Sequence, residues 1–139
     1  MTSAMTQAMT IESTRATLDK YFNAEHSDGS MMAADVVFTV MATGQEHHGP
    51  DAVLGMLQYF YHIAFEATAS MTNMVIGEGK AITEWDFTGK HTGEFAGVPA
   101  TGKEVHVPLC VAYDLENNRI KRGRIYFEIP AFLAQVGTI

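Results

Sequence analysis

The sequence predicts an α+β domain in which N-terminal helices lie against a curved β-sheet. Apolar residues recur at helical spacing in the first half of the chain, and the pattern changes to that of long strands between residues 70 and 128. Strands of about ten residues twist rather than stay flat, so the sheet should curl around the helices into a cone. The concave interior of that cone is where we expect a ligand.

The first half of the chain should contain a helix, a strand and the start of a second helix. Thr10 can cap a helix that runs to about Ala24, with an acidic residue in the first turn to suit the helix dipole. A short helical turn over residues 31–34 is expected to precede a strand over residues 35–41. A loop follows, and Pro50 suits the first position of the next helix because its missing N–H has no partner there.

The second helix should extend through Phe65, with an apolar stripe wide enough to cover a sheet. Strands are predicted over residues 70–77, 80–90, 104–115 and 119–128, and a short helix between Pro130 and Gly137. We assign residues 10–139 to one domain, because a single core usually occupies about 100–200 residues. Residues 1–9 lack the features of a signal peptide and are expected to be a disordered leader.

Composition narrows the classes of function. The chain has 9 Lys and Arg against 16 Asp and Glu, a formal charge of −7, whereas nucleic-acid binding is driven by clustered basic residues. No apolar run approaches the roughly 20 residues of a membrane span. The single cysteine, Cys110, excludes an internal disulfide and a cysteine-based zinc site. We therefore expect a soluble cytoplasmic protein that binds neither nucleic acid nor membranes.

Two segments carry a resemblance to a known family. Residues 89–103 read GKHTGEFAGVPATGK, and residues 132–137 read FLAQVG. They resemble the signature loop and the Leu-Leu-x-Gln-Leu-Gly ending of SnoaL-like polyketide cyclases, which are members of the nuclear transport factor 2-like superfamily. The resemblance covers residues 10–137 in the expected order. It implies a cone-shaped, curved mixed β-sheet closed by N-terminal helices around a deep pocket.

The family's catalytic residues are not retained in this sequence. The resemblance implies ring closure by an intramolecular aldol step without a cofactor, using an Asp on the last strand, a His on the strand before it and an Asn on the first strand. The matching positions here are Ile125, Val111 and Phe38. None of these side chains can carry a proton, so the acid/base set of the family is absent.

Alternation along the strands separates the expected pocket from the outer face of the sheet. The apolar side chains that share the face of Ile125 should form the interior. Together with one residue of the second helix, the predicted ligand-binding residues are Phe38, Phe60, Trp85, Phe87, Val111, Ile125 and Phe127.

The outer face should carry charged residues. Glu84, Asp86 and Glu128 fall on this face by the same alternation. Arg122 and Arg124 are their expected partners in cross-strand ion pairs. Members of the superfamily often dimerise through this convex face, so the resemblance implies a homodimer.

Three polar residues are candidates for catalysis. His91 lies in the signature loop, where a neutral imidazole can act as a general acid or base near pH 7, or can hold the loop in place by hydrogen bonds. Tyr21 and Tyr113 can donate to a carbonyl oxygen, or can be amphipathic core residues. The adjacent His47 and His48 point to opposite sides of an extended chain, so we expect no metal site there and no cofactor.

Three functions remain open from the sequence. The leading hypothesis is a cofactor-independent cyclase or isomerase that acts on a small, flat, apolar carbonyl compound. The alternative is a non-catalytic protein that binds a small hydrophobic ligand in the same cavity, which explains the missing acid/base set more simply. A weaker third hypothesis is a protein-interaction module that works through the convex face.

Overall fold

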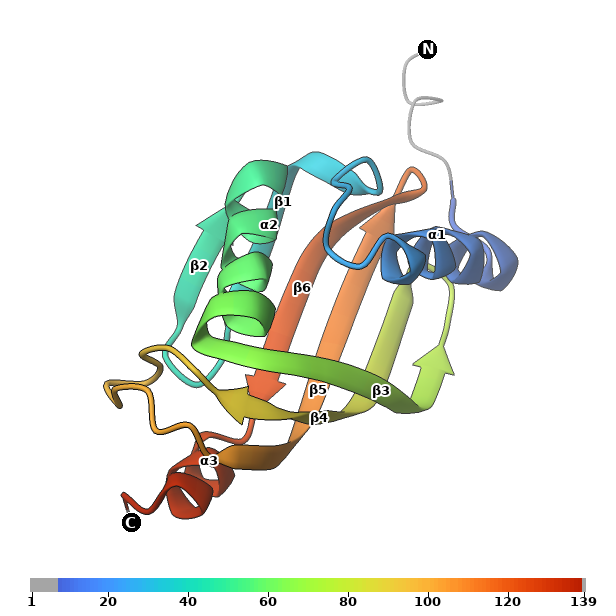
Figure 1. Cartoon of the computed structure of the whole chain (residues 1–139). Coiled ribbons are helices and arrows are strands. Elements are labelled where there is room, and N and C mark those ends of the chain that lie inside the picture. Colours follow the sequence, from blue (N-terminus) through green and yellow to red (C-terminus); the bar gives the residue numbers. More distant parts are fainter. Residues whose placement is uncertain (1–7, 139) are drawn as a thin grey trace.

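The structure, a computed structural model, describes residues 8–138, in which three helices and a π-helical turn lie against a six-stranded sheet (Figure 1). The helical segments are α1 (Ile11–Asn23), α2 (Pro50–Tyr59), η2 (Phe60–Ala64), which continues α2, and α3 (Ile129–Val136). The strands are β1 (Met32–Val40), β2 (Gln45–His48), β3 (Phe65–Ile76), β4 (Lys80–His91), β5 (Glu104–Glu116) and β6 (Arg119–Phe127). The predicted α+β class is confirmed.

The first helix begins where the sequence predicts. The Ser13 N–H donates to Thr10 Oγ1 at 3.0 Å, and the Thr10 N–H donates to Ser13 Oγ at 2.9 Å, so a reciprocal capping box starts α1. Residues 1–7 of the predicted leader lie outside the described residues. Met9 is only 8% exposed and belongs to the hydrophobic core, so the ordered fold includes this residue of the predicted leader.

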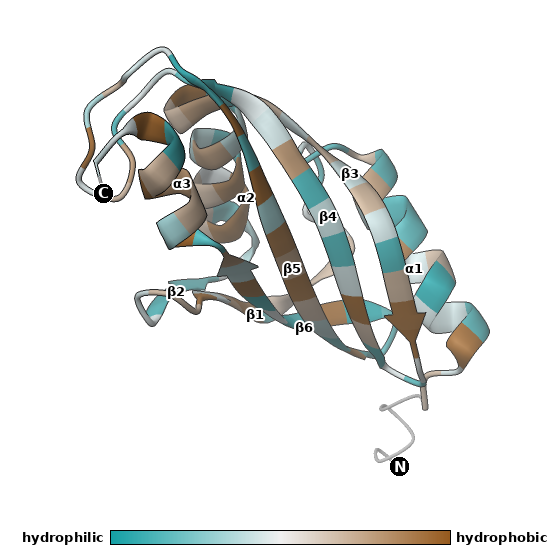
Figure 2. Ribbon diagram, turned by 90° about the horizontal axis from the view of Figure 1, so that it is seen from below, coloured by the Kyte–Doolittle hydropathy of each residue, from teal (hydrophilic) through white to brown (hydrophobic). Residues whose placement is uncertain are grey.

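The sheet is mixed, as the resemblance implies. The strand order is β2-β1-β6-β5-β4-β3, with β1 parallel to β6 and every other neighbouring pair antiparallel. The strands twist strongly along their length, and hydrophobic residues run along β5 (Figure 2). Both α1 and α2 lie over one face of this sheet, and α3 lies at one end (Figure 1).

Three segments differ from the sequence prediction. The expected helical turn at 31–34 is instead the start of β1, where Met32 pairs with Ile120 of β6. The expected loop at 44–49 contains β2, which pairs with β1. Strand β3 begins at Phe65 rather than at residue 70, so it follows η2 directly without the expected linker, whereas the second helix ends with η2 at Ala64, one residue before the predicted end. Each segment gains backbone hydrogen bonds from a neighbouring strand, and these outweigh the local pattern.

An aromatic core fills the end of the sheet nearest to α3. Phe65 and Phe87 are fully buried with their ring centroids 5.0 Å apart edge to face, and Phe60 stacks on Phe87 at 4.7 Å. Phe127 and Phe132 complete this cluster. The aromatic core occupies the concave face at this end, and space for a cavity remains between α1 and η2.

The predicted alternation between the two faces is confirmed on β5 and β6. Val105 and Val107 of β5 are buried on the concave side, whereas His106 between them is exposed. On β6, Phe127 is buried and its neighbour Tyr126 is exposed.

Candidate functional site

A cavity of about 360 Å³ lies between the concave face of the sheet and the helices. Its walls come from the end of α1 and the turn after it, from α2 and η2, and from strands β3 to β6. This volume lies within the range of about 300–1,000 Å³ that is usual for small-molecule sites. The ionisable side chains in its lining are Tyr21, Glu25, His26, Tyr61, His62 and Tyr113.

Four of the seven predicted ligand-binding residues line this cavity, namely Phe60, Trp85, Val111 and Ile125. The other three lie on the predicted face but not in the cavity lining. Phe87 and Phe127 belong to the aromatic core, and Phe38 covers Gly123, where an added Cβ would lie 2.7 Å from the ring. Alternation along a strand assigns the face of a residue, but not its depth along the cone.

The two positions on β5 and β6 that match catalytic residues of the family lie in the cavity wall. Val111 and Ile125 face each other across β5 and β6, and both are buried. Because neither side chain can bind or release a proton, any proton transfer in this cavity must use other groups.

Tyr21 and Tyr113, both predicted as site residues, meet in this cavity. Their ring centroids are 6.0 Å apart, and their exposed fractions are 5% and 4%. Burial, and then the charge of the nearby Tyr61, raises the pKa of Tyr21, while a hydrogen bond with Tyr113 opposes this rise. Burial is also the largest cause that raises the pKa of Tyr113. Both phenols therefore stay neutral. Because one phenol O–H is used in the hydrogen bond between them, the pair keeps one O–H that can donate to a ligand.

Trp85 provides a flat apolar wall. Its indole N–H donates to Thr83 Oγ1 at 2.7 Å, and that hydroxyl donates to the Val111 carbonyl oxygen at 3.0 Å. The polar atoms of this pair are thus satisfied within the protein. Phe22 packs edge to face against the indole at 5.2 Å, so the aromatic surroundings suit a flat ligand.

His26 is a cavity residue that is not among the predicted site residues. Its ring stacks on Tyr61, with centroids 4.4 Å apart and an interplanar angle of 20°. Burial lowers the pKa of His26, the charge of His62 lowers it further, and Glu25 opposes these effects. No local sequence pattern marks this residue, because its position depends on how the chain leaves α1.

His62 also lines the cavity, from the π-helical turn η2. Glu66, four residues later, no longer lies on the helix, because the chain has entered β3 by that residue. A π-helical turn inserts an extra residue into the helical repeat and is frequent at functional sites. Here it brings Tyr61 and His62 from adjacent positions to the same cavity.

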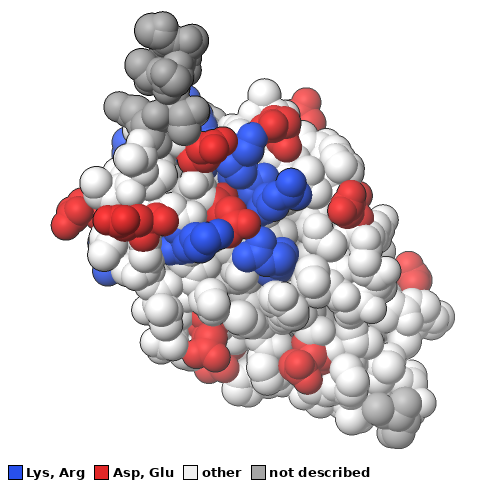
Figure 3. Space-filling view, turned by 180° about the vertical axis from the view of Figure 1, so that it is seen from behind, with Lys and Arg blue, Asp and Glu red and all other residues white. Residues whose placement is uncertain are grey.

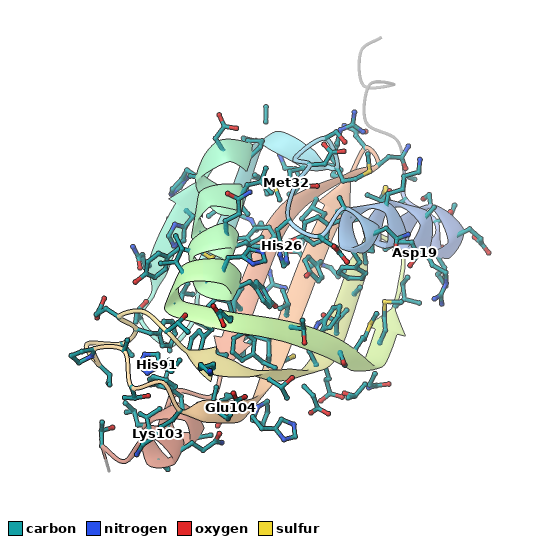
Figure 4. The ribbon with its side chains drawn as sticks, in the orientation of Figure 1. Asp19, His26, Met32, His91, Lys103 and Glu104 are labelled. Carbon is teal, nitrogen blue, oxygen red and sulfur yellow. The ribbon has the colours of Figure 1, made fainter. Side chains whose placement is uncertain are left out.

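His91 lies outside this cavity. The imidazole is fully buried, its Nδ1 lies 2.9 Å from Thr101 Oγ1, and its ring packs against Phe65 and Phe132. Figure 4 shows His91 beside the signature loop, apart from His26, which lies between α1 and α2. This geometry supports the loop-holding role that the sequence left open for His91, rather than a role in the chemistry of the cavity.

The adjacent histidines of β2 also lie outside the cavity. His48 Nε2 lies 3.0 Å from Glu46 Oε1 in an exposed contact, and His47 is half-buried. Among the described residues, no group of three or more His, Cys, Asp or Glu side chains is arranged to hold a metal ion.

The convex face of the sheet carries a cluster of basic side chains around an acidic one (Figure 3). Asp114 accepts hydrogen bonds from Arg124 at 2.9 Å and from Lys80 at 3.0 Å. The bond from Arg124 holds the pKa of the Asp114 carboxyl below its ordinary value, and partial burial opposes it. Lys121 pairs with Asp35 on β1 at 2.8 Å.

The predicted ion pairs on this face are therefore wrong for Arg124, whose partner is Asp114. Glu84 instead accepts a hydrogen bond from Asn73 at 3.0 Å, and Asp86 lies 3.4 Å from His106. The register explains the difference, because it sets Ala112 opposite Arg124 and leaves Asp114 diagonal to it.

The fold defines the class of protein. A curved mixed sheet with helices over its concave face is a nuclear transport factor 2-like and ketosteroid isomerase-like fold. Within that class, the chain belongs to the SnoaL-like polyketide cyclase family, whose model matches residues 14–136. No helix within residues 8–138 is long and apolar enough to cross a membrane.

Solved structures share this fold at low sequence identity. A candidate SnoaL-like polyketide cyclase from Jannaschia sp. CCS1 is 17% identical, with a TM-score of 0.80 over 92% of this chain and 94% of that one. The candidate hydroxylase AclR from Streptomyces galilaeus is 16% identical, with a TM-score of 0.73 over 93% and 98%. A protein with a ketosteroid isomerase-like fold from Catenulispora acidiphila DSM 44928, in complex with trimethylamine, is 16% identical, with a TM-score of 0.71 over 88% and 93%. No curated protein matches the sequence significantly.

Proposed function

We propose that this chain binds a flat, largely apolar carbonyl compound and promotes cofactor-independent proton transfer of the cyclase or isomerase type. The observation that carries the proposal is the pair of buried phenols, Tyr21 and Tyr113, in a cavity whose lining is largely aromatic and aliphatic. Neutral phenols donate hydrogen bonds to a carbonyl oxygen. Such bonds strengthen as negative charge develops on that oxygen, so they favour enolate formation.

A non-catalytic binding protein is the second candidate. It is favoured by Val111 and Ile125, which supply apolar wall where the family's catalysts have proton carriers. The two candidates share the ligand class and differ in outcome. A binding protein returns its ligand unchanged, whereas an enzyme of this type exchanges or moves a proton.

The proposal includes a homodimer that forms through the convex face. Val75 and Ile82 are cross-strand neighbours on β3 and β4 with exposed fractions of 61% and 49%. Tyr126 of β6 adds a third large exposed side chain on this face. Exposed apolar side chains that share one face are a usual feature of interaction surfaces.

Carbonyl recognition can be measured with Trp85, the only tryptophan of the chain, because its fluorescence should change when a ligand enters the cavity. The matched probes are 2-tetralone, a small aromatic ketone, and tetralin, its hydrocarbon analogue. We expect Tyr21→Phe to weaken binding of 2-tetralone by about 5–10-fold, the effect of one lost hydrogen bond of about 1–1.4 kcal/mol. Binding of tetralin should not change.

The control variant is Tyr126→Phe, which removes an exposed phenol from the outer face and should leave both affinities unchanged. An equal loss for the ketone and the hydrocarbon would show that Tyr21 only shapes the cavity. If neither probe alters the Trp85 fluorescence, the ligand class is wrong.

A further inference from the structure

We propose that His26 is the catalytic residue that takes up and returns the proton, and that the substrates carry an acidic C–H bond next to a carbonyl group. This inference rests on the proposed function, since it requires a carbonyl compound in the cavity. It assigns the acid/base role to the turn after α1 instead of to the strand positions or to the signature loop.

The imidazole of His26 is available to a ligand. It is half-buried in the cavity lining, and the parallel stack on Tyr61 fixes the plane of its ring. Within residues 8–138, the hydrogen bond at His26 is accepted by its backbone carbonyl oxygen and not by its ring, so the lone pair of the neutral imidazole is free. In contrast, His91 is enclosed by Phe65, Phe132 and Thr101, and its buried Nε2, which has no hydrogen-bond partner, lies away from the cavity.

The backbone around His26 adopts an unusual conformation. Glu25 and His26 are consecutive non-glycine residues in the left-handed region, with φ of 51° and 66°. Two side-chain hydrogen bonds stabilise this turn. Gln58 Nε2 donates to the His26 carbonyl oxygen at 3.2 Å, and Ser27 Oγ donates to the Ala24 carbonyl oxygen. Such strained residues persist only where the surroundings impose them, and they cluster at active sites. Here the left-handed turn brings the imidazole into the cavity.

Tyr61 connects His26 with the two carbonyl-binding phenols. Its ring stacks on His26, and it lines the same cavity as Tyr21 and Tyr113. A ketone whose oxygen accepts a hydrogen bond from this phenol pair therefore lies in the same cavity as the imidazole.

The proposed step balances without a cofactor. The C–H bond beside the carbonyl breaks, its proton forms a new N–H bond on His26, and its electron pair moves onto the carbonyl oxygen as an enolate. The phenol pair donates a hydrogen bond to that oxygen. The imidazolium then returns the proton to the same carbon, to another carbon of the ligand, or to the alkoxide left when the enolate carbon closes a ring on a second carbonyl.

The charges around His26 favour its neutral form. Burial and then His62 of η2 lower the pKa of His26 below its ordinary value near 6.5, and only Glu25 in its own turn opposes them. Tyr61, the other ionisable group packed on the ring, stays neutral because burial raises its pKa. The imidazole is thus a base at neutral pH, and its activity should fall only at a pH below 6.5.

The experiment follows hydrogen–deuterium exchange at C1 of 2-tetralone in D2O by proton NMR, with the rate in buffer subtracted. We expect the wild-type protein to accelerate exchange and His26→Asn to lower the protein-catalysed rate by at least about 100-fold, the usual contribution of a general base. Asparagine suits this position because it tolerates the left-handed region. The affinity for 2-tetralone, measured by Trp85 fluorescence, should stay within about twofold of the wild-type value.

His91→Asn is the matched control. A second variant, His62→Asn, should shift the midpoint of the pH profile upward, because it removes a charge that lowers the pKa of His26. His91→Asn should leave the pH profile unchanged, since His91 lies outside the cavity.

The outcomes separate this inference from the proposed function. If 2-tetralone binds and exchanges equally fast in His26→Asn, the role of His26 is refuted and the proposed function stands. Binding without any catalysed exchange in the wild type overturns both the catalytic proposal and the role of His26, and leaves the binding alternative. Absence of binding overturns the proposed function and this inference together.

Discussion

Phenols, rather than carboxylates, are the polar groups of this cavity that a ligand oxygen can meet. Burial of Tyr21 and Tyr113 raises the pKa of each phenol, because a phenolate would lose its hydration there. A phenol with a raised pKa is a hydrogen-bond donor at any physiological pH. Carbonyl recognition by these two residues should therefore be independent of pH, whereas proton transfer through His26 should not.

Gly123 is the residue on β6 that allows Phe38 to lie against the sheet. An added Cβ at Gly123 would lie 2.7–2.8 Å from three carbons of the Phe38 ring, and both residues are buried. Phe38, which matches the family's catalytic Asn on the first strand, thus occupies the space above Gly123. This contact fills the concave face beside the cavity.

We predict that Gly123→Ala lowers the free energy of unfolding by about 2 kcal/mol, because overpacking a tight core usually costs about 1–3 kcal/mol. Urea unfolding measures this value. Gly55→Ala is the control, since no atom lies within 4 Å of its added Cβ and alanine favours the helix by up to about 1 kcal/mol. The double variant with Phe38→Leu should recover part of the loss, and similar stabilities for both alanine variants would contradict the packing argument.

At the scale of elements, the signature loop between β4 and β5 holds the π-helical turn in place. The backbone N–H groups of Thr92 and Gly93 both donate to the Ala64 carbonyl oxygen at 2.9 Å. Gly93 permits this approach, because an added Cβ there would overlap the Ile63 carbonyl oxygen. Since η2 carries Tyr61 and His62, the loop contributes to the cavity by positioning that turn.

His91 and Thr101 close this loop. Besides the contact between their side chains, the His91 backbone accepts from Gly102 N–H at 2.8 Å and donates to the Lys103 carbonyl oxygen at 2.9 Å. We predict that Thr101→Val destabilises the protein by about 1 kcal/mol, the usual net value of a hydrogen bond. Urea unfolding gives the loss, and faster amide exchange at Gly102 would locate it.

Thr88→Val on the exposed side of β4 is the control and should leave stability within about 0.5 kcal/mol of the wild type. The affinity of Thr101→Val for 2-tetralone should change less than twofold, because neither Thr101 nor His91 lines the cavity. A large loss of affinity would instead show that the loop reaches the ligand.

At the scale of the whole molecule, the two faces of the sheet have different properties. The concave face is apolar and encloses the cavity, whereas the convex face carries the ion pairs around Asp114 together with exposed apolar side chains. The negative charge is dispersed over the first 100 residues, which hold 12 of the 16 acidic side chains and 4 of the 9 basic ones and so carry −8, whereas the remaining residues carry +1. The convex face is therefore a mixed surface suited to contact with a second copy.

The proposed homodimer predicts a mass of twice 15.2 kDa in sedimentation equilibrium. Ile82→Glu should convert the dimer into a monomer, because it buries a charge in an apolar contact. Ile11→Glu, which changes an exposed apolar residue on α1, should leave the dimer intact. A wild-type protein that sediments with the mass of one chain would contradict the dimer.

Much of the fold follows from local features of the sequence. The capping box at Thr10, the proline that begins α2 and the alternation on β5 all depend on neighbours within a few residues, and the structure confirms each. The start of β3 and the existence of β2 could not be predicted in this way. Both depend on hydrogen bonds to strands that lie elsewhere in the sequence.

The same distinction applies to the candidate site, because some of its features follow from local sequence and others only from contacts between distant segments. The sequence by itself determined the family, the inward faces of β5 and β6 and the loss of proton carriers at Val111 and Ile125, because these follow from motif and alternation. Only the tertiary structure decided that His26 lies in the cavity and His91 outside it. The reason is that depth along a cone and a left-handed turn after a helix are set by contacts between distant segments, which no local pattern records.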